Sequence, residues 1–521
     1  MKLISLISPE EKKIFFIPFL LFIVILLAEV ITILILNSGL IVYTTDDAYI
    51  HLALAENILK GHYGVNLQEY SSPSSSILWP LILAPFTGLS ISYLMPLIVN
   101  TLSAIGTMFI FFLLKKEIFL KESSGSSKFN KIALLFLILL IPAANLIGSL
   151  FSGMEHTIQI FFTVLIIWGL ITAIQQKYIS KWLLAAIIIA PLVRYENLAL
   201  SFASLIFLYF AGYKKQAVLI FIFITALTAS FSVFLLNLEL EPLPLSVFQK
   251  SSVVSSGSIN SILENFKTNI FNPRCSLLLV GVFVLSYLAL SRKRNKEERL
   301  LAGCFALAIL LHLLICKHGR YMVYIWTASV LTFLFLSREW LIKVIAQNSF
   351  FKTAALASII TILFSYYYIF NIITIPVASN NIYEQQYQMH RFITEYYKKP
   401  VAVNDLGYVS YRNNNYVLDL IGLASPEALN YRRINDKTDW IDTLSRRHNV
   451  ELAIIYDDWF DKIPGSWYKA AELSLGKIKL SPSRYMVSFY LLNNDKKDEV
   501  VKLLKTFRET LPKGVKLTIW D

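Results

Sequence analysis

The chain has 521 residues, of which 56% are hydrophobic and only 16% are charged, and its mean hydropathy is +0.57. Since an average soluble chain carries about 25% charged residues, this composition excludes an ordinary soluble enzyme, a disordered chain, a collagen-like fibre and a disulfide scaffold. The net charge of +13 does not indicate a nucleic-acid partner, because Lys and Arg gather in the cytoplasmic loops of membrane proteins. The sequence therefore predicts a mainly α, polytopic membrane protein.

Eleven apolar runs follow one another along the chain, and a helix needs about 20 mostly apolar residues to cross a bilayer. We predict spans near 14–36, 91–114, 131–150, 157–175, 182–193, 197–212, 216–236, 276–291, 299–316, 321–337 and 353–375. The run 182–193 is short, so the predicted number is about eleven. The apolar run 77–89 contains Pro80 and Pro85 and is interpreted as a re-entrant or interfacial helix.

Lys and Arg are distributed unevenly between the connections of these spans. The alternate set that begins with residues 1–13 holds 20 of them, and the set that begins with residues 37–90 holds 7. Because the richer set is expected to be cytoplasmic, we predict a cytoplasmic N-terminus and an outer location for residues 376–521. The predicted domains are a transmembrane catalytic domain (1–375, first outer loop 37–90) and an extracytoplasmic domain (376–521).

The tail from residue 376 has the composition of an ordinary globular domain. Short β-like runs occur in it, namely PVAVND, NYVLDLI, VELAIIYD, YMVSFYLL and VKLTIW. Helical stretches lie between them, such as YEQQYQMHRFITEYYKK and KKDEVVKLLKTFRETL. This mixture predicts a small C-terminal α/β domain.

Asp46 and Asp47 precede the amphipathic stretch AYIHLALAENILKG, whose helix is expected to end at Gly61. One aspartate can cap this helix, so the other is free to take a proton from an acceptor hydroxyl or to bind a cation. His51 follows Asp47 by four residues and can share its helix face. We expect a surface histidine here rather than a metal ligand, because a metal site needs more ligands.

Further ionisable residues are predicted at the same outer face, and such groups at membrane depth are functional candidates by default. Glu155 begins a predicted span, where it either complements the helix dipole or belongs to a site. Arg194 lies in a tight turn between two predicted spans. It can bind a phosphate bidentately or pair with Glu196 or Asp46.

Two other outer segments carry basic residues. Lys250 lies in ELEPLPLSVFQKSS, where Pro242 and Pro244 are expected to prevent regular helix. It either meets an anionic head group or is a solvated interfacial lysine. The segment KHGRY, at the end of a predicted span, adds Lys317, His318 and Arg320. Snorkelling toward the interface explains Lys317, so Arg320 is the better phosphate candidate.

Seven stretches in order from residue 44 to residue 427 resemble a known class. They are TTDDAYIHLALAENILKGHYGVN, SSPSSSILWPLIL, SGMEHT, RYEN, PLPLSVFQK, HGRY and VNDLGYVSYRNNNYVLDLIGLASPE. As an ordered set they resemble the GT-C membrane glycosyltransferases, which use polyprenyl-phosphate-linked sugars. More narrowly, the set resembles the branch that includes the mycobacterial terminal arabinofuranosyltransferase.

The resemblance implies a role for each candidate. An acid in the first outer loop acts as catalytic base in this class, and Asp46 and Asp47 occupy that place. Basic residues near the membrane hold the lipid phosphate, and the matching positions are Arg194, Lys250 and Arg320. We take Glu155, Glu196 and His318 as substrate-binding candidates.

The chain also departs from the class pattern at two places. Relatives often have Arg-Pro-Glu where this chain has Arg194-Tyr195-Glu196, and Asn after the proline where it has Pro244-Leu245-Ser246. These departures leave the sugar open. No cofactor is expected. A divalent metal is possible, although three cysteines are too few for a disulfide framework or a cysteine metal site.

The predicted function is transfer of a sugar from a polyprenyl-phosphate donor to an envelope glycan, glycolipid or protein acceptor at the outer face of a bacterial inner membrane. No Rossmann or P-loop fingerprint indicates a nucleotide-sugar donor. One alternative is a transporter or lipid flippase, but such proteins usually carry polar groups near the midplane and internal repeats. A non-catalytic assembly factor is a third interpretation.

Overall fold

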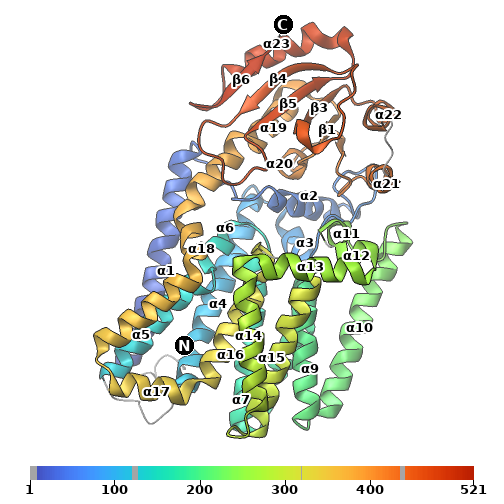
Figure 1. Cartoon of the computed structure of the whole chain (residues 1–521). Coiled ribbons are helices and arrows are strands. Elements are labelled where there is room, and N and C mark those ends of the chain that lie inside the picture. Colours follow the sequence, from blue (N-terminus) through green and yellow to red (C-terminus); the bar gives the residue numbers. More distant parts are fainter. Residues whose placement is uncertain (1–8, 120–126, 251, 318, 435–439, 521) are drawn as a thin grey trace.

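The computed structural model describes residues 9–119, 127–250, 252–317, 319–434 and 440–520. A bundle of long helices carries, at one of its ends, a smaller domain built around a β-sheet (Figure 1). We call this end of the bundle the domain end, and the opposite end the far end.

Within the described ranges, nine helices are long and apolar enough to cross a membrane. They are α1 (Pro9–Leu36), α4 (Met95–Ile118), α5 (Ser127–Ala143) continued by α6 (Leu146–Phe151), α7 (His156–Gln176), α10 (Lys214–Asn237), α14 (Pro273–Leu290), α15 (Lys296–Ile315), α16 (Val323–Leu336) with the 3₁₀ turn Gly319–Met322 before it, and α18 (Phe350–Glu384). Two apolar helices of 13 residues, α8 (Lys181–Val193) and α9 (Leu198–Phe210), bring the total to the eleven predicted segments. The chain is thus a mainly helical, multi-pass membrane protein.

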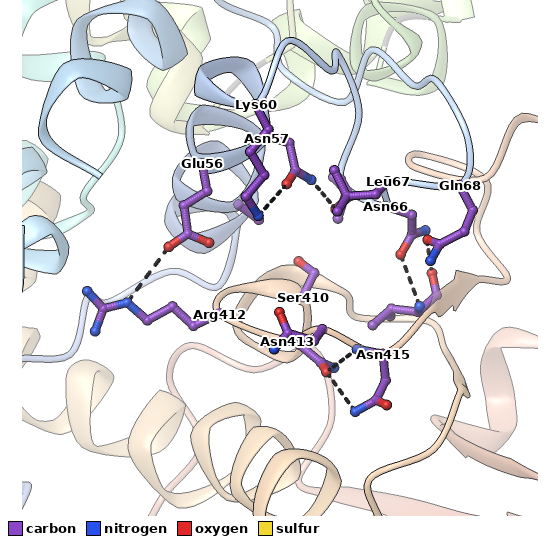
Figure 2. Close-up of a pocket in the computed structure, with 14 residues that line it drawn as sticks. Glu56, Asn57, Lys60, Asn66, Leu67, Gln68, Ser410, Arg412, Asn413 and Asn415 are labelled. Atoms are coloured by element: carbon purple, nitrogen blue, oxygen red, sulfur yellow. Dashed lines mark hydrogen bonds and ion pairs between the residues drawn. The ribbon is translucent and has the colours of Figure 1, made fainter. Parts of the chain in front are cut away.

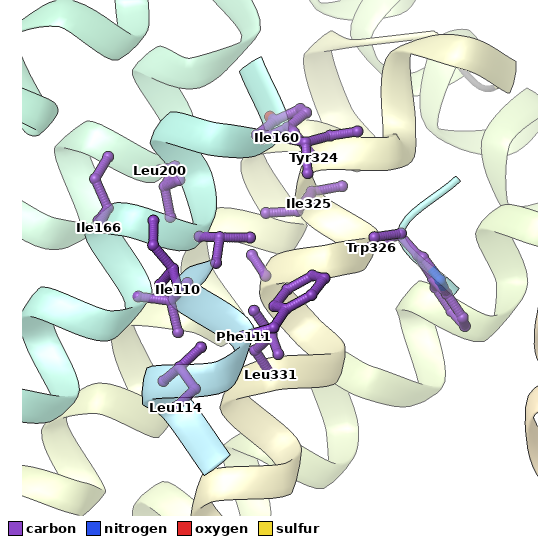
Figure 3. Close-up of a cluster of buried hydrophobic side chains, with 14 of the residues drawn as sticks. Ile110, Phe111, Leu114, Ile160, Ile166, Leu200, Tyr324, Ile325, Trp326 and Leu331 are labelled. Carbon is purple, nitrogen blue, oxygen red and sulfur yellow. The ribbon is translucent and has the colours of Figure 1, made fainter. Parts of the chain in front are cut away.

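The bundle is held by one continuous apolar core. In Figure 3, side chains of α4 (Ile110, Phe111), α7 (Ile160) and α16 (Ile325, Leu331) interdigitate. The helices α8 and α9 are too short to cross a bilayer alone, since 13 residues reach only about 20 Å. They can be accommodated because they pack within this core. α8 packs on α7 and α10, and α9 packs on α10 and α15, so longer neighbours surround both short helices.

Short helices cover the domain end. They are α2 (Asp47–Leu59), α3 (Leu78–Leu83), α11 (Leu245–Lys250), α12 (Ser252–Ser256) and α13 (Ile259–Phe271). The predicted helix at 77–89 is confirmed as α3 and a following 3₁₀ turn. The expectation of an irregular loop at 239–252 is wrong after Pro244, because a proline just before a helix costs that helix no hydrogen bond. The helix α17 (Arg338–Gln347) lies at the far end.

The domain at the end of the bundle contains a six-stranded sheet in the order β2-β1-β3-β5-β4-β6. Its strands are β1 (Val401–Val403), β2 (Val417–Asp419), β3 (Leu452–Ile455), β4 (Tyr468–Ser474), β5 (Met486–Leu491) and β6 (Lys516–Ile519). The pairs β2-β1 and β1-β3 are parallel, and the remaining pairs are antiparallel. Five strands coincide with the predicted runs, whereas β4, with the mixed sequence YKAAELS, was not predicted.

Helices flank the sheet on both faces. They are α19 (Gln386–Arg391) with a π-helical segment (Phe392–Tyr397), α20 (Gly407–Ser410), α21 (Pro426–Ile434), α22 (Trp440–Arg447) and α23 (Lys497–Arg508). Phe392 and Phe507 pack with Phe489 in one core, and Leu444 packs with Ile455 in another. Residue 376, where the second domain was expected to begin, lies inside α18, which continues to Glu384.

The helix α2 lies between the bundle and the sheet domain. Ile50 and Ala53 belong to the core of the sheet domain, whereas Tyr49 and Leu52 pack with α3 and the end of α18. The predicted helix end is confirmed, since Gly61 has a φ of +76° just after the last turn. Because both faces of α2 are buried, the acidic residues at its start are held firmly at the junction.

A candidate active site at the domain end of the bundle

Asp46 and Asp47 point to different partners. The carboxylate of Asp46 accepts hydrogen bonds from the backbone N–H groups of Gly407 (2.7 Å) and Tyr408 (2.8 Å), which begin α20 of the sheet domain. Only 8% of Asp46 is exposed, and its side chain makes no capping bond to α2. Asp46 thus connects the sheet domain to the start of α2 and does not cap this helix with its side chain, while its role as a catalytic base stays a prediction.

A second carboxyl group lies beside Asp46. Burial raises the pKa of Asp46, repulsion from Asp405 raises this pKa further, and the backbone bonds from Tyr408 and Gly407 lower it. Burial also raises the pKa of Asp405, which accepts hydrogen bonds from Gln386 (2.8 Å) and Tyr456 (3.2 Å). The pair therefore holds a proton more tightly than ordinary carboxyl groups do.

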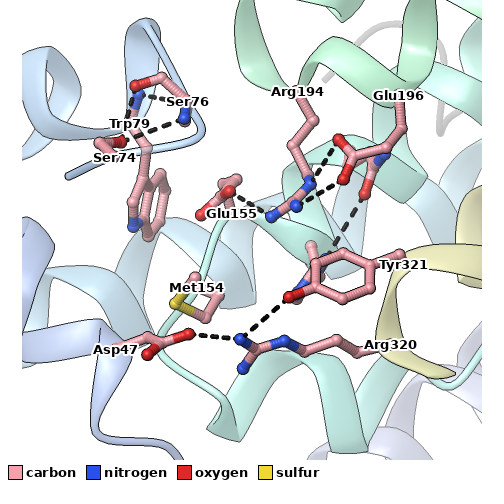
Figure 4. A network of polar contacts seen from close by, with 12 residues as sticks. Asp47, Ser74, Ser76, Trp79, Met154, Glu155, Arg194, Glu196, Arg320 and Tyr321 are labelled. Carbon is pink, nitrogen blue, oxygen red and sulfur yellow. Dashed lines mark hydrogen bonds and ion pairs between the residues drawn. The ribbon is translucent and has the colours of Figure 1, made fainter. Parts of the chain in front are cut away.

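Asp47 faces the bundle instead and forms an ion pair with Arg320 (Figure 4). The two side chains are 27% and 33% exposed, so a ligand can reach both. Arg320 also donates a hydrogen bond to the hydroxyl of Tyr321 (3.4 Å). An accessible carboxylate beside an accessible guanidinium is a suitable pair for a hydroxyl group and an anion.

Arg194 is enclosed by two carboxylates. It donates to Glu155 (2.5 Å) and, through two nitrogens, to Glu196 (2.7 and 3.1 Å). Arg194 is 1% exposed and Glu155 is fully buried. Arg194 is thus buried and already paired with two carboxylates in this structure, and its phosphate-binding role stays a prediction. Glu155 and Glu196 both face Arg194, and their substrate-binding roles likewise stay predictions.

Tyr321 links the two arginines. Its ring centre lies 5.2 Å from the guanidinium carbon of Arg194 and 5.4 Å from that of Arg320. Cations are attracted to the face of an aromatic ring. Tyr321 therefore couples the position of the exposed Arg320 to the rigid, buried cluster around Arg194.

His51 belongs to the buried side of this network. It is 3% exposed, and its Nε2 lies 3.6 Å from the Oε2 of Glu155. The expectation of a surface histidine is wrong, because α2 turns this face toward the start of α7. In the described part of the chain, His, Cys, Asp and Glu side chains form no group of three or more arranged to hold a metal ion.

The connection before α7 brings Glu155 close to α2. Gly153 has a φ of +68°, and a Cβ added there would lie 2.7 Å from the Cβ of Ala48. Only glycine permits both this conformation and this approach. The SGMEHT stretch thus needs its glycine so that the connection can pack on α2.

Trp79 of α3 closes the site from the side opposite to Arg194 (Figure 4). Its side chain is fully buried, and its Nε1 has no hydrogen-bond partner among the described residues. A buried donor without a partner is costly. In Figure 4 the nitrogen edge of the indole is turned toward Met154 and Asp47.

Two predicted residues cannot be placed in the site. Lys250 is the last residue of α11, and its side chain lies outside what the structure describes. His318 lies outside the described residues altogether.

Sequence reasoning missed Asp405, Tyr321 and Trp79. Of these, Asp405 carried a signal, because it follows a predicted strand in PVAVND and acids at such strand ends often serve sites.

Comparisons with known proteins give the following. Residues 380–490 match the family described as "Domain of unknown function (DUF8728)". No curated protein matches the chain. Among solved structures, the chain is similar to the oligosaccharyltransferase of Archaeoglobus fulgidus, in the apo form (TM-score 0.45, 13% identity, 83% of this chain and 69% of that chain) and in complex with zinc and sulfate (TM-score 0.42, 14% identity, 83% of this chain and 67% of that chain).

Proposed function

We propose that this protein is a membrane glycosyltransferase of the GT-C type that moves a sugar from a polyprenyl-phosphate donor to a hydroxyl-bearing acceptor. The observation that carries the proposal is the accessible Asp47–Arg320 pair at the domain end of an apolar bundle. A lipid-linked sugar has its tail in the bilayer and its phosphate at the membrane surface. A site for it needs a base and a cation at that level, and this pair supplies both.

Each residue of the pair has one part in the reaction. Asp47 accepts the proton of the acceptor hydroxyl while the hydroxyl oxygen forms a bond to the anomeric carbon of the donor. The bond between that carbon and the phosphate oxygen breaks at the same time, and its electrons leave with the phosphate. Arg320 stabilises the negative charge that develops on the phosphate. Polyprenyl phosphate and the glycosylated acceptor are the products.

In this proposal, the Asp47–Arg320 ion pair is the state of the site before the donor binds. A donor phosphate competes with Asp47 for the Arg320 guanidinium, which releases the carboxylate to act as base. The buried Arg194 cluster does not take part directly. It supports Tyr321, and Tyr321 in turn holds Arg320.

The charge distribution supports an extracytoplasmic site. The Lys- and Arg-rich connections include α17 and the turn between α14 and α15, which lie at the far end. Positive connections are typical of the cytoplasmic side, and the domain end would then face outward. We propose a bacterial inner membrane as the location and an envelope glycan, glycolipid or protein as the acceptor. Membership of the arabinofuranosyltransferase branch is part of the same proposal and rests on the ordered motifs.

Replacement of the two residues tests the proposal. Cells that make the wild-type protein are compared with cells that make Asp47→Asn, Arg320→Gln or the control Asp461→Asn, whose side chain is exposed on the sheet domain. Membrane abundance is matched, and both the envelope glycans and the pool of lipid-linked sugars are analysed by mass spectrometry. We expect Asp47→Asn and Arg320→Gln to lose one defined sugar residue and to accumulate its lipid-linked donor, and the control to behave as wild type.

Two outcomes would contradict the proposal. Unchanged glycans in both variants would exclude this pair from catalysis. Accumulation of a complete lipid-linked glycan on the cytoplasmic side would indicate a flippase instead.

A further inference from the structure

A polar cavity lies at the end of α2 that is away from Asp47. It is enclosed by the last two turns of α2, the loop 60–68 and the segment 410–417 of the sheet domain (Figure 2). Its volume is about 180 Å³. The nine residues from Asp47 to Glu56 span about 14 Å of helix, so the cavity is separated from the candidate active site but lies along the same helix.

The walls of the cavity are fixed by two asparagines. Asn57 donates to the backbone carbonyls of Gly64 (2.9 Å) and Val65 (2.7 Å), which closes the loop after α2. Asn66 donates to the carbonyl of Val417 (2.9 Å) and accepts from its N–H (3.0 Å), which joins this loop to the edge strand β2. The cavity is therefore formed before any ligand arrives, a property that lowers the cost of binding.

The remaining polar groups face the opening. Gln68 and Asn414 are exposed residues of the lining. Asn413 and Asn415, also in the lining, hydrogen-bond to each other (Figure 2). A carboxamide is both a donor and an acceptor, and so is a sugar hydroxyl. A row of carboxamides at a preformed opening is chemically matched to a ligand rich in hydroxyl groups.

The lining of the cavity carries few charges. Glu56 pairs with Arg412 (3.7 Å), and Lys60, which donates to the amide oxygen of Asn57 (3.4 Å), leaves a net charge of +1. Six carboxamides against three charged side chains in the lining favour a neutral polar ligand over a polyanion, which would need several cations.

We propose that this cavity binds a neutral segment of the acceptor glycan, several sugar units away from the hydroxyl group that reacts at Asp47. This inference rests on the proposed function, because it assigns the acceptor to a glycan. An extended glycan held between α2 and the sheet domain would run along α2 toward Asp47. The sheet domain then serves to position the acceptor as well as to cover the site.

Saturation-transfer NMR on the full-length protein in detergent tests the inference. The probe is the water-soluble glycan that mild acid releases from the envelopes of cells producing the Asp47→Asn protein. Four proteins are compared: wild type, Asp47→Asn, the double variant Gln68→Ala/Asn414→Ala, and the control Asn494→Ala, which removes an exposed amide outside the cavity. The substituted side chains are exposed, so the fold is expected to tolerate these changes.

We expect wild type and Asn494→Ala to bind the glycan equally and Asp47→Asn to retain binding through the cavity. The double variant should bind it about tenfold more weakly than Asn494→Ala, the change expected from the loss of two net hydrogen bonds. Absence of binding to wild type, or equal binding by the double variant, would overturn the inference. The experiment distinguishes failure of the proposed transferase function from failure of the proposed glycan site. If Asp47→Asn cells keep a normal envelope glycan while the cavity binds it, the transferase assignment falls and the glycan site stands.

Discussion

Asp47 and Arg320 form an ion pair although 273 residues separate them in the chain, whereas Asp46, the immediate neighbour of Asp47, binds the backbone of Gly407 and Tyr408. Two adjacent carboxylates thus serve two purposes. One is presented to the membrane side of the junction, and the other secures the sheet domain above it. The position of the candidate base depends on both, because α2 is held between the bundle and the domain.

Arg320→Gln should raise the KM for the lipid-linked donor by about tenfold to a hundredfold, the range that corresponds to one charge-assisted hydrogen bond. Arg320→Lys keeps the charge but not the planar fork, so we expect an intermediate KM. The measurement is transfer of a radiolabelled lipid-linked sugar in membranes over a range of donor concentrations. A donor KM that is the same in all three proteins would remove Arg320 from phosphate binding.

Arg194→Met should destabilise the bundle rather than act on the donor, because it leaves Glu155 and Glu196 buried without their counter-charge. Removing one partner of a buried ion pair costs about 3–5 kcal/mol. We expect a clear fall in the thermal midpoint of the purified protein, and partial recovery in Arg194→Met/Glu155→Gln. A variant of normal stability with a raised donor KM would instead restore Arg194 as a phosphate ligand.

Asp46→Ala should loosen the sheet domain, since two buried backbone N–H groups lose their acceptor at a cost of about 1–3 kcal/mol each. Limited proteolysis followed by mass spectrometry should then show faster cleavage near residues 404–408 than in wild type. Gly407→Ala should act in the same direction, because its Cβ would lie 2.5 Å from the Oδ2 of Asp46. Cleavage at the wild-type rate in both variants would show that this contact does not hold the domain.

The Asp46–Asp405 pair should make stability depend on pH. Because their pKa values are raised in the folded protein, the folded state binds protons more tightly than the unfolded state does. This stabilisation is complete below about pH 3.9, the ordinary carboxyl pKa, and is lost as the pH rises through the raised values. Asp405→Asn removes the repulsion at high pH.

Thermal unfolding between pH 5 and pH 8 checks this expectation. The midpoint should fall with rising pH in wild type and in the control Asp461→Asn, and should fall less in Asp405→Asn. Equal slopes in wild type and Asp405→Asn would show that the pair carries no excess proton.

Much of the architecture could be predicted from local patterns. The helix at 47–59 with its glycine end, the apolar spans and the strands at 401–403 and 452–455 each follow from a run of neighbouring residues. Hydropathy patterns and turn residues act over a few neighbouring positions, so these elements can be predicted from the sequence alone. The strand at 468–474 was missed because its alternation is interrupted by Lys469 and Glu472, which pair with each other at the surface.

Only the tertiary structure decided which of the candidate acids and arginines are accessible and which are buried in ion pairs or hydrogen bonds. From sequence, Asp46 and Asp47 are equivalent, and Arg194 and Arg320 are equally suited to a phosphate. Burial separates them: Arg194 is enclosed with Glu155 and Glu196, while Arg320 stays accessible beside Asp47. Electrostatic function depends on partners and solvent access, and both are set by segments that lie far apart in the chain and meet only when it folds.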